Sequence, residues 1–299
     1  HPYLGRHYPG AERDGGIDGA LLRGHFAGAF PEAAPGWHKG TAGAILIVGG
    51  SEGLTGAPHL AARAALRAGG GLISVAAPHG LCRDIKADCP DIMTRALGPA
   101  GNVRWSPALL EELLPFLRQC GAMVLGPGIG REPETAAFVQ ALLMCPSRPS
   151  AVVDADALHA LAMHPEALSS LRACDVLTPH PGEAATLLHT TPALVQADRF
   201  AALAGLRRLA PSVWILKGAG TLIGTEGQPV TIAPYAEPNL AVGGSGDVLS
   251  GCLGTLMAQT AAHPSEGCES SSFLAACMGV HLHARAGRLL RETFPQRGN

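Results

Sequence analysis

The stretch Gly243-Gly244-Ser245-Gly246-Asp247-Val248-Leu249-Ser250-Gly251 joins a tight glycine turn to the start of an apolar run with helical spacing. Glycine lets a phosphate approach the backbone closely, and the N–H groups at a helix N-terminus hold anions. Asp247 lies at the mouth of this turn, where a carboxylate can cap the helix or act as a general base beside a bound phosphate. The stretch therefore predicts an anion-binding helix start with one candidate base.

The rest of the chain repeats one pattern, in which a short apolar run is followed by a turn and then by a helical segment. Runs that are apolar at every position are typical of strands buried on both faces of a sheet. The expected strands are 44–48, 72–77, 122–125, 151–153, 176–177 and 213–216, with a hairpin formed by 221–225 and 230–233. Strands that alternate with helices predict an α/β fold, with a mostly parallel sheet, helices on both faces and ligands beyond the carboxyl ends of the strands.

Helices are expected at 109–117, 133–143 and about 270–291, and after the glycine turns near residues 56 and 247. The helix that opens at Gly56 is expected to direct Leu60, Ala64, Ala65 and Ala68 inward.

Composition limits the classes of function. The chain has 299 residues, a formal net charge of −2 and no clustered basic face, so we expect no nucleic-acid partner. No apolar run is long enough to span a bilayer, and we expect no membrane contact. Eight cysteines form no C-x-x-C pair, which disfavours structural zinc, and their scatter through apolar segments is typical of reduced cytoplasmic thiols. Neither a Walker A sequence nor a Rossmann glycine motif is present.

The chain divides into two parts by composition. Residues 1–36 are rich in Gly, Pro and His and are interpreted as a linker or the tail of a preceding domain. Residues 37–299 form the α/β domain, whose C-terminal end we expect to be truncated.

Three strand-end residues have two interpretations each. Lys217 can neutralise a phosphate or be a solvated hairpin residue, and the sequence favours neither. Asp154 can hold Mg²⁺ or be structural, and these readings are also level. For Asp156 a helix cap is favoured over a metal ligand.

His180 and Glu183 share one turn after a strand. Glu183 can orient a metal-bound water near a phosphate while His180 hydrogen-bonds a substrate. Both also suit a helix start with an acidic first turn, and the two interpretations are compatible.

The order of these motifs resembles that of the NAD(P)H-hydrate dehydratase family, within the ribokinase-like superfamily. The matching segments are H-K-G at 38–40, G-A at 56–57, A-L-R-A-G at 65–69, G-P-G-I-G at 126–130, D-A-D-A-L at 154–158, T-P-H-P-G-E at 178–183, L-K-G-A-G-T at 216–221 and the glycine stretch at 243–251. The resemblance implies a ribokinase-like three-layer α/β/α sandwich.

The resemblance also implies an activity. The family uses ADP or ATP to remove water from the S epimer of NADHX or NADPHX, which restores NADH or NADPH. The implied route phosphorylates the ring hydroxyl and then eliminates phosphate, a better leaving group than hydroxide. Mg²⁺ is the implied cofactor. The implied assembly is a homo-oligomer, with a tetramer compatible, and an epimerase domain is often fused in one polypeptide.

Site residues follow from the same resemblance. Ala57, Gly128, His180 and Asp247 would contact the hydrated cofactor, with Asp247 as the base. Glu183 matches the metal-water position of the superfamily. The residues implied to hold the adenine nucleotide are Lys217, Gly218, Ala219, Gly220, Thr221 and Gly246.

Two positions depart from the family pattern. Glu237 stands where Asn is expected, and Val242 stands where a small polar residue is common. These differences affect the expected nucleotide contacts.

Two other functions fit the same motifs. A ribokinase-like kinase for a vitamin precursor would share the fold and Asp247 but would leave a stable phosphoester. A regulatory module would bind nucleotide without turnover, although Asp247, Lys217 and Glu183 together argue against it.

Overall fold

The computed structural model describes residues 15–16, 39–40, 42–262 and 268–294. Its strands form one ten-stranded sheet in the order β1-β10-β9-β8-β7-β6-β5-β2-β3-β4. Pairs from β4 across to β8 are parallel, whereas β9 is antiparallel to β8 and β10. The strands are β1 (Gly15–Gly16), β2 (Ala44–Val48), β3 (Leu72–Pro78), β4 (Met93–Leu97), β5 (Ala122–Leu125), β6 (Ser150–Val153), β7 (Val176–Leu177), β8 (Val213–Leu216), β9 (Leu222–Gly224) and β10 (Thr231–Ile232).

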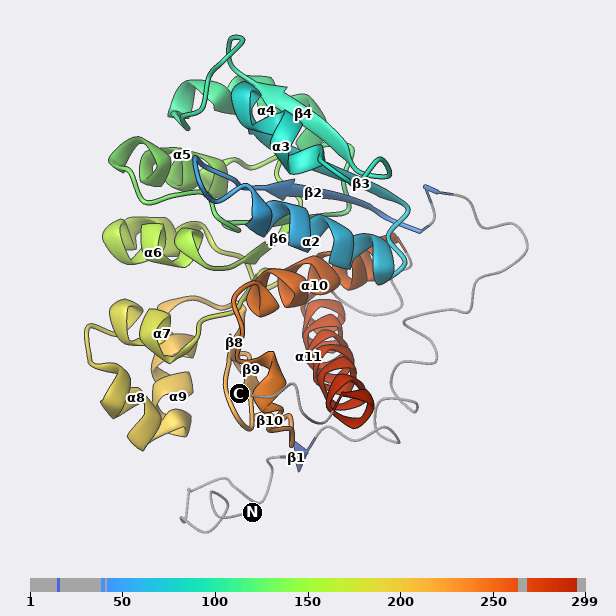
Figure 1. The fold of residues 1–299 in the computed structure, drawn as a ribbon. Coiled ribbons are helices and arrows are strands. Elements are labelled where there is room, and N and C mark those ends of the chain that lie inside the picture. Colours follow the sequence, from blue (N-terminus) through green and yellow to red (C-terminus); the bar gives the residue numbers. More distant parts are fainter. Residues whose placement is uncertain (1–14, 17–38, 41, 263–267, 295–299) are drawn as a thin grey trace.

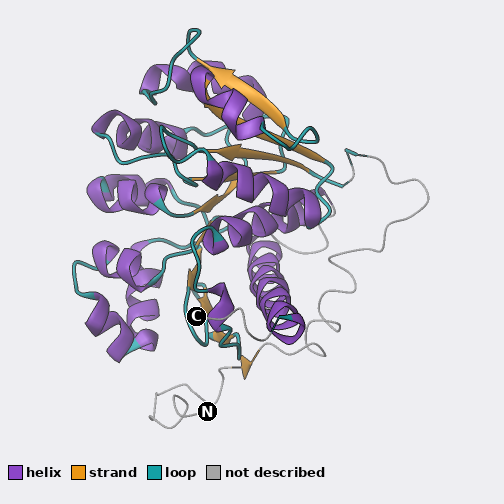
Figure 2. Ribbon diagram, in the orientation of Figure 1, coloured by secondary structure: helices purple, strands orange, loops and turns teal. Residues whose placement is uncertain are grey.

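Helices cover both faces of this sheet. They are α2 (Gly56–Arg67), α3 (Cys82–Lys86), α4 (Leu110–Leu117), α5 (Pro133–Met144), α6 (Asp156–Met163), α7 (Pro181–Leu187), α8 (Pro192–Ala197), α9 (Arg199–Leu209), α10 (Ser245–Ala262) and α11 (Cys268–Thr293). Figure 1 shows α5, α6, α7 and α9 on the left of the sheet and α10 and α11 on its right. Figure 2 shows the same three layers by type of element.

The two faces of the sheet carry separate apolar clusters because successive side chains of a strand point in opposite directions. In β2, Leu46 and Val48 belong to the cluster under α4, α5, α6, α7 and α9. Ile45 and Ile47 belong to the cluster under α2, α3, α10 and α11. This double burial explains the continuous apolar runs and confirms the predicted three-layer α/β fold.

Helices α2 and α10 lie side by side, α2 over β2 and β3 and α10 over β2, β5 and β6 (Figure 1). A Cβ added at Gly251 of α10 would lie 2.0 Å from the carbonyl oxygen of Ala61, so the two backbones touch. The predicted inward face of α2 is therefore wrong except at Ala65. Its buried residues are Pro58, Ala61, Ala62 and Ala65, because small side chains permit the close approach.

Leu60, which was expected in the core, is half-buried and covers the glycine turn instead. Its Cδ1 atom would lie 2.5 Å from a Cβ at Gly244.

Most predicted elements are confirmed to within a residue or two. Strand β4 and helices α3, α8 and α9 were not predicted. The sequence M-T-R-A-L of β4 lacks an apolar run because this edge strand is only partly buried. The assignment of residues 1–36 lies outside the described residues except for Gly15–Gly16, which pair with β10. In the described part of the chain, no helix combines the length and apolarity needed to cross a membrane.

Candidate functional site

The carboxyl ends of neighbouring strands meet through hydrogen bonds between their turns. Gly50 N–H donates to the carbonyl of Pro127, and Gly126 N–H donates to that of Val48. A Cβ at Gly126 would lie 1.9 Å from the carbonyl oxygen of Asp154, so this contact requires glycine. The turns after β2, β5 and β6 therefore form one continuous surface at this edge, as the sequence predicted.

The glycine stretch forms the start of α10 at the same edge. Gly244 has a φ of +88°, a conformation that favours glycine, and the helix begins at Ser245. Asp247 lies in the first turn of α10. Its carboxylate makes no hydrogen bond with any described residue, so it does not cap the helix. Burial, and then repulsion from Asp154, raise the pKa of Asp247 to about 6. This carboxylate suits a general base.

Lys217 is held under the glycine turn by a buried carboxylate. Its Nζ lies 2.8 Å from Oδ1 of Asp154, and the Ser250 hydroxyl donates to the other oxygen of that carboxylate. Burial alone would raise the pKa of Asp154, but the charge and hydrogen bonds of Lys217, with Ser250 and Thr178, lower it. Burial opposes the charge on Lys217, yet Asp154 and Glu183 raise its pKa. The ion pair thus holds the Lys217 ammonium group at the start of α10, the predicted anion-binding position.

This arrangement bears on two alternatives that the sequence left open. Lys217 is not a solvated hairpin residue, because its side chain is 20% exposed and paired. Both carboxylate oxygens of Asp154 accept hydrogen bonds from protein groups, which favours the structural reading of this residue.

Asp156 does not cap its own helix, contrary to the prediction. The N-cap residue of α6 is Ala155, and the Asp156 carboxylate points back to the turn after β5. It accepts from the N–H of Gly130 at 3.2 Å and from Nε of Arg131 at 2.7 Å. The positive φ of Ala155, 51°, turns the chain so that this contact forms.

His180 and Glu183 form a capping box at the start of α7. Nδ1 of His180 accepts from the N–H groups of Gly182 and Glu183, at 2.9 and 3.2 Å, and Oε2 of Glu183 accepts from the N–H of His180 at 2.7 Å. Burial, with Lys217 nearby, lowers the pKa of His180, so a neutral ring carries its proton on Nε2. Burial raises the pKa of Glu183 to about 7, although Lys217 opposes the shift.

A cavity of about 650 Å³ opens beside the glycine turn. Most residues predicted to hold the nucleotide line it, namely Lys217, Gly218, Ala219, Thr221 and Gly246, together with His180. Gly220, with a φ of +65°, turns the loop between them and donates its N–H to Tyr235. The Thr221 hydroxyl donates to the carbonyl of Gly218, so it closes this loop.

The other predicted substrate contacts lie on the opposite side of the glycine turn. A Cβ at Gly128 would lie 3.1 Å from Cβ of Ala57, so the start of α2 and the turn after β5 are in contact. The residues predicted for the nucleotide mark one side, here called the nucleotide side, and Ala57 and Gly128 mark the other, called the substrate side. His180, which is also predicted for the substrate, lines the cavity on the nucleotide side. The charges of Lys217 and Asp156 both act on the pKa of Asp247, which Lys217 lowers and Asp156 raises.

Two residues around the loop after β8 and the cavity beside it were missed by the sequence reasoning. Arg199 of α9 donates to the carbonyls of Leu216, Lys217 and Ala219 and so holds the loop after β8. His283 of α11 lines the cavity, and its Nε2 lies 3.2 Å from the Ser245 hydroxyl. No local motif marks these residues, because only the fold brings them to the loop.

Glu237, one of the two departures from the family pattern, is compensated by this chain's own residues. Its side chain is 2% exposed and lies 3.2 Å from Nε of both Arg288 and Arg291, on α11. The buried charge is therefore paired. Val242, the other departure, is 63% exposed.

The carboxylates at this edge could hold Mg²⁺ together with substrate phosphates and water, but not as a cage of protein ligands. Within the described residues, no group of three or more His, Cys, Asp or Glu side chains is arranged to hold a metal ion. Because Mg²⁺ commonly keeps several waters and binds one or two carboxylates together with substrate phosphates, such a cage is not required. Glu183, which lies 3.8 Å from Nζ of Lys217, is the carboxylate suited to that role.

Comparisons with known proteins show the family of the chain. The family profile described as NAD(P)H-hydrate dehydratase matches residues 45–296. The bifunctional NAD(P)H-hydrate repair enzyme Nnr of Moorella thermoacetica is 42% identical over 271 residues, which cover 90% of this chain and 48% of that protein. The ADP-dependent (S)-NAD(P)H-hydrate dehydratase of Neisseria meningitidis serogroup B is 34% identical, over 90% of this chain and 84% of that protein. The chain thus spans about half the length of the bifunctional relatives.

Solved structures share its ribokinase-like fold. A ribokinase-like superfamily protein from Enterococcus faecalis V583 matches with a TM-score of 0.77 at 20% identity, covering 96% of this chain and 91% of that chain. The ADP/ATP-dependent NAD(P)H-hydrate dehydratase from Bacillus subtilis, co-crystallized with ATP/Mg²⁺, matches with a TM-score of 0.69 at 22% identity, covering 90% and 88%.

Proposed function

The chain belongs to the NAD(P)H-hydrate dehydratase family, and on this premise we propose that it repairs hydrated nicotinamide cofactors. It removes water from (6S)-NADHX and (6S)-NADPHX at the expense of ADP or ATP and releases phosphate. The observation that carries the proposal is the Lys217–Asp154 ion pair under the glycine turn, with Asp247 beside it.

The nucleotide occupies the cavity beside the loop after β8. Lys217 and the N–H groups at the start of α10 neutralise its phosphates. This charge lowers the barrier to attack on the terminal phosphoryl group, since phosphoryl transfer depends on positioning and neutralisation.

Asp247 takes the proton from the ring hydroxyl of the substrate. The hydroxyl oxygen forms a bond to the terminal phosphorus, and the bridging P–O bond breaks to release AMP from ADP or ADP from ATP. The ring nitrogen then donates its lone pair as the C–O bond to phosphate breaks. Loss of a proton from the neighbouring carbon restores the dihydronicotinamide double bond. A raised pKa suits Asp247 to the first proton transfer near neutral pH.

The substrate ring lies on the side of Ala57 and Gly128. His180 donates from Nε2, because its Nδ1 is occupied by two backbone N–H groups. Mg²⁺, held by the nucleotide phosphates and through water by Glu183, would supply further charge neutralisation.

Several wider properties are part of this proposal. The chain is one half of a polypeptide with an epimerase domain, which is supported by its match to half of relatives named bifunctional. We also propose a cytoplasmic homo-oligomer, which light scattering of the purified protein would test.

The experiment that tests the proposal is recovery of dihydronicotinamide absorbance from chemically hydrated NADH. Wild type with Mg²⁺ and ADP or ATP should restore the absorbance, and Asp247→Asn should lower kcat by roughly 10²-fold or more. Asp91→Asn, which alters an exposed carboxylate before β4, should behave as wild type. A folded, nucleotide-binding wild type that restores no absorbance would contradict the proposal, and a stable phosphoester product would instead favour the vitamin-precursor kinase.

A further inference from the structure

A second hollow, of about 140 Å³, lies between the start of α5 and the length of α6, from Asp156 to His164. It opens at the carboxyl edge of the sheet, beside the turn that contains Gly128. Arg131, Asp156, His159 and His164 contribute its polar lining. The residues assigned so far to substrate and nucleotide do not line this hollow.

Arg131 is held in place by the carboxylate beneath it. The side chain of Asp156 is 13% exposed, and it binds Nε of Arg131 at 2.7 Å and the N–H of Gly130 at 3.2 Å. The side chain of Arg131 is 62% exposed, and within the described residues its two terminal nitrogens donate to no acceptor. An ion pair through Nε therefore leaves the forked end of Arg131 directed to solvent at a fixed place.

The backbone supports this arrangement. Ala155, which precedes Asp156, has a φ of +51°, a conformation that non-glycine residues adopt only when their surroundings enforce it. Gly130, which donates to the same carboxylate, has a φ of +91°. The backbone conformations of Ala155 and Gly130 thus both allow the same contact, and that contact positions Arg131.

The charge of Arg131 reaches the proposed substrate contacts. Its charge contributes to the lowered pKa of His180 and opposes the burial that raises the pKa of Glu183. Of the acidic groups nearby, Asp156 is paired with Arg131 itself and Glu166 lies 3.3 Å from Nδ1 of His164. Lys217, on the nucleotide side, is paired with Asp154.

A hydrated dinucleotide carries anionic groups away from its reacting ring. Both hydrates have a pyrophosphate bridge, and NADPHX has a 2′-phosphate in addition. A planar guanidinium with free donors matches the oxygen atoms of a phosphate group. We propose that Arg131, positioned by Asp156, binds a phosphate group of the hydrated dinucleotide. This inference rests on the proposed function and deepens it.

The test compares Arg131→Gln with wild type on NADHX and on NADPHX at saturating ADP. The KM for the dinucleotide should rise about tenfold, as for one lost charge-assisted hydrogen bond, while kcat and the KM for ADP stay unchanged. An equal rise for both hydrates assigns Arg131 to the pyrophosphate, and a rise for NADPHX alone assigns it to the 2′-phosphate. Added salt should narrow the difference from wild type, because the contact is electrostatic.

Arg118→Gln is the matched control, since Arg118 is an exposed arginine that follows α4 at the opposite edge of the sheet. It should leave every constant unchanged. An active Arg131→Gln protein whose KM values equal those of wild type would overturn this inference and leave the proposed function intact. A wild type without nucleotide-dependent dehydration would overturn the proposed function and this inference with it.

Discussion

Asp154 connects the two chemical groups on which the proposed reaction depends. It pairs with Lys217 at 2.8 Å, which keeps the phosphate-binding cation in place. Burial is the larger cause of the raised pKa of Asp247, and the negative charge of Asp154 raises it further. One buried residue thus positions the cation and adjusts the base, a combination that is common in active sites.

The pKa of Asp247 predicts how activity depends on pH. A general base must be deprotonated, so kcat/KM should fall as the pH drops through about 6, the pKa of this carboxyl group. Steady-state rates across this range would measure the fall. Glu183→Gln is the control. Because the pKa of Glu183 is raised to about 7, its removal should leave the fall of kcat/KM near pH 6 in place. A wild-type profile that stays flat through this range would contradict the role of Asp247.

At the scale of elements, the contact between α2 and α10 places the glycine turn. The two helices touch where Gly251 meets the backbone of Ala61, and small residues of α2 face α10. This close approach also sets Gly244, just before α10, against Leu60 of α2. The distance between the helices therefore sets how the substrate and nucleotide sides meet.

Gly251→Ala should test this contact. The added methyl group would lie 2.0 Å from the carbonyl oxygen of Ala61, so the helices must separate. We expect the free energy of unfolding to fall by about 3 kcal/mol, as for overpacked cores. Urea denaturation would measure it. Gly56→Ala, at the first residue of α2, meets nothing within 4 Å and should leave the midpoint near that of wild type. Equal midpoints for both variants would refute the close packing.

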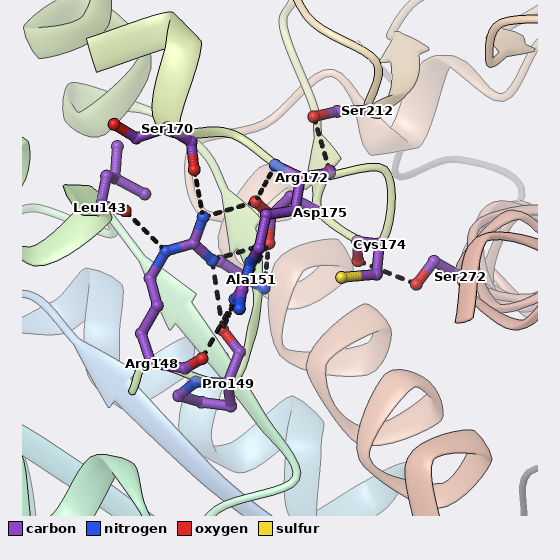
Figure 3. Close-up of polar contacts among 10 residues, drawn as sticks. All are labelled: Leu143, Arg148, Pro149, Ala151, Ser170, Arg172, Cys174, Asp175, Ser212 and Ser272. Atoms are coloured by element: carbon purple, nitrogen blue, oxygen red, sulfur yellow. Dashed lines mark hydrogen bonds and ion pairs between the residues drawn. The ribbon is translucent and has the colours of Figure 1, made fainter. Parts of the chain in front are cut away.

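At the scale of the whole molecule, the two edges of the sheet have different roles. The carboxyl edge carries the proposed site, and the amino edge carries a buried ion pair (Figure 3). Arg148 and Asp175 are 1% and 0% exposed and lie 2.6 Å apart. Asp175 also accepts from the N–H groups of Ala151 and Arg172, and Arg148 donates to the carbonyls of Leu143 and Ser170, so the network joins α5 to the strands β6 and β7.

Asp175→Asn should destabilise the protein strongly while sparing the site. It leaves the Arg148 guanidinium buried without a counter-charge, which costs about 3–5 kcal/mol of unfolding free energy. Thermal or urea denaturation would measure the loss, and kcat per folded molecule should not change. Glu166→Gln, which removes an exposed carboxylate near His164, should be indistinguishable from wild type. A small effect of Asp175→Asn would mean that the network does not hold this edge.

Local sequence predicted the elements and most of the site residues because both depend on neighbours in the chain. Strands buried on two faces must be apolar at every position, and β2, β5, β7 and β8 have the predicted positions. Glycine at Gly126 and Gly244 marks turns with positive φ. The edge strand β4, with its mixed sequence, lacked such a signal.

The partners of the polar groups could not be predicted in the same way. Asp154 meets Lys217 63 positions away, and Ser250 96 positions away, through contacts that no local spacing encodes. Asp156 looked like a helix cap because Asp is common there, but the fold directs it to Arg131. His283 lines the cavity beside the glycine turn, and Arg199 contacts the loop after β8, only because α11 and α9 pack there.

The amino-acid sequence alone thus determined the alternation of strands and helices, the edge at which ligands are proposed to bind and the residue types available there, since these follow from hydrophobic period and turn chemistry. Only the tertiary structure decided which of those residues are charged partners, which are supports and which face open space. The physical reason is that burial and the distance between charges set pKa values and ion pairs, and both arise when distant segments pack together.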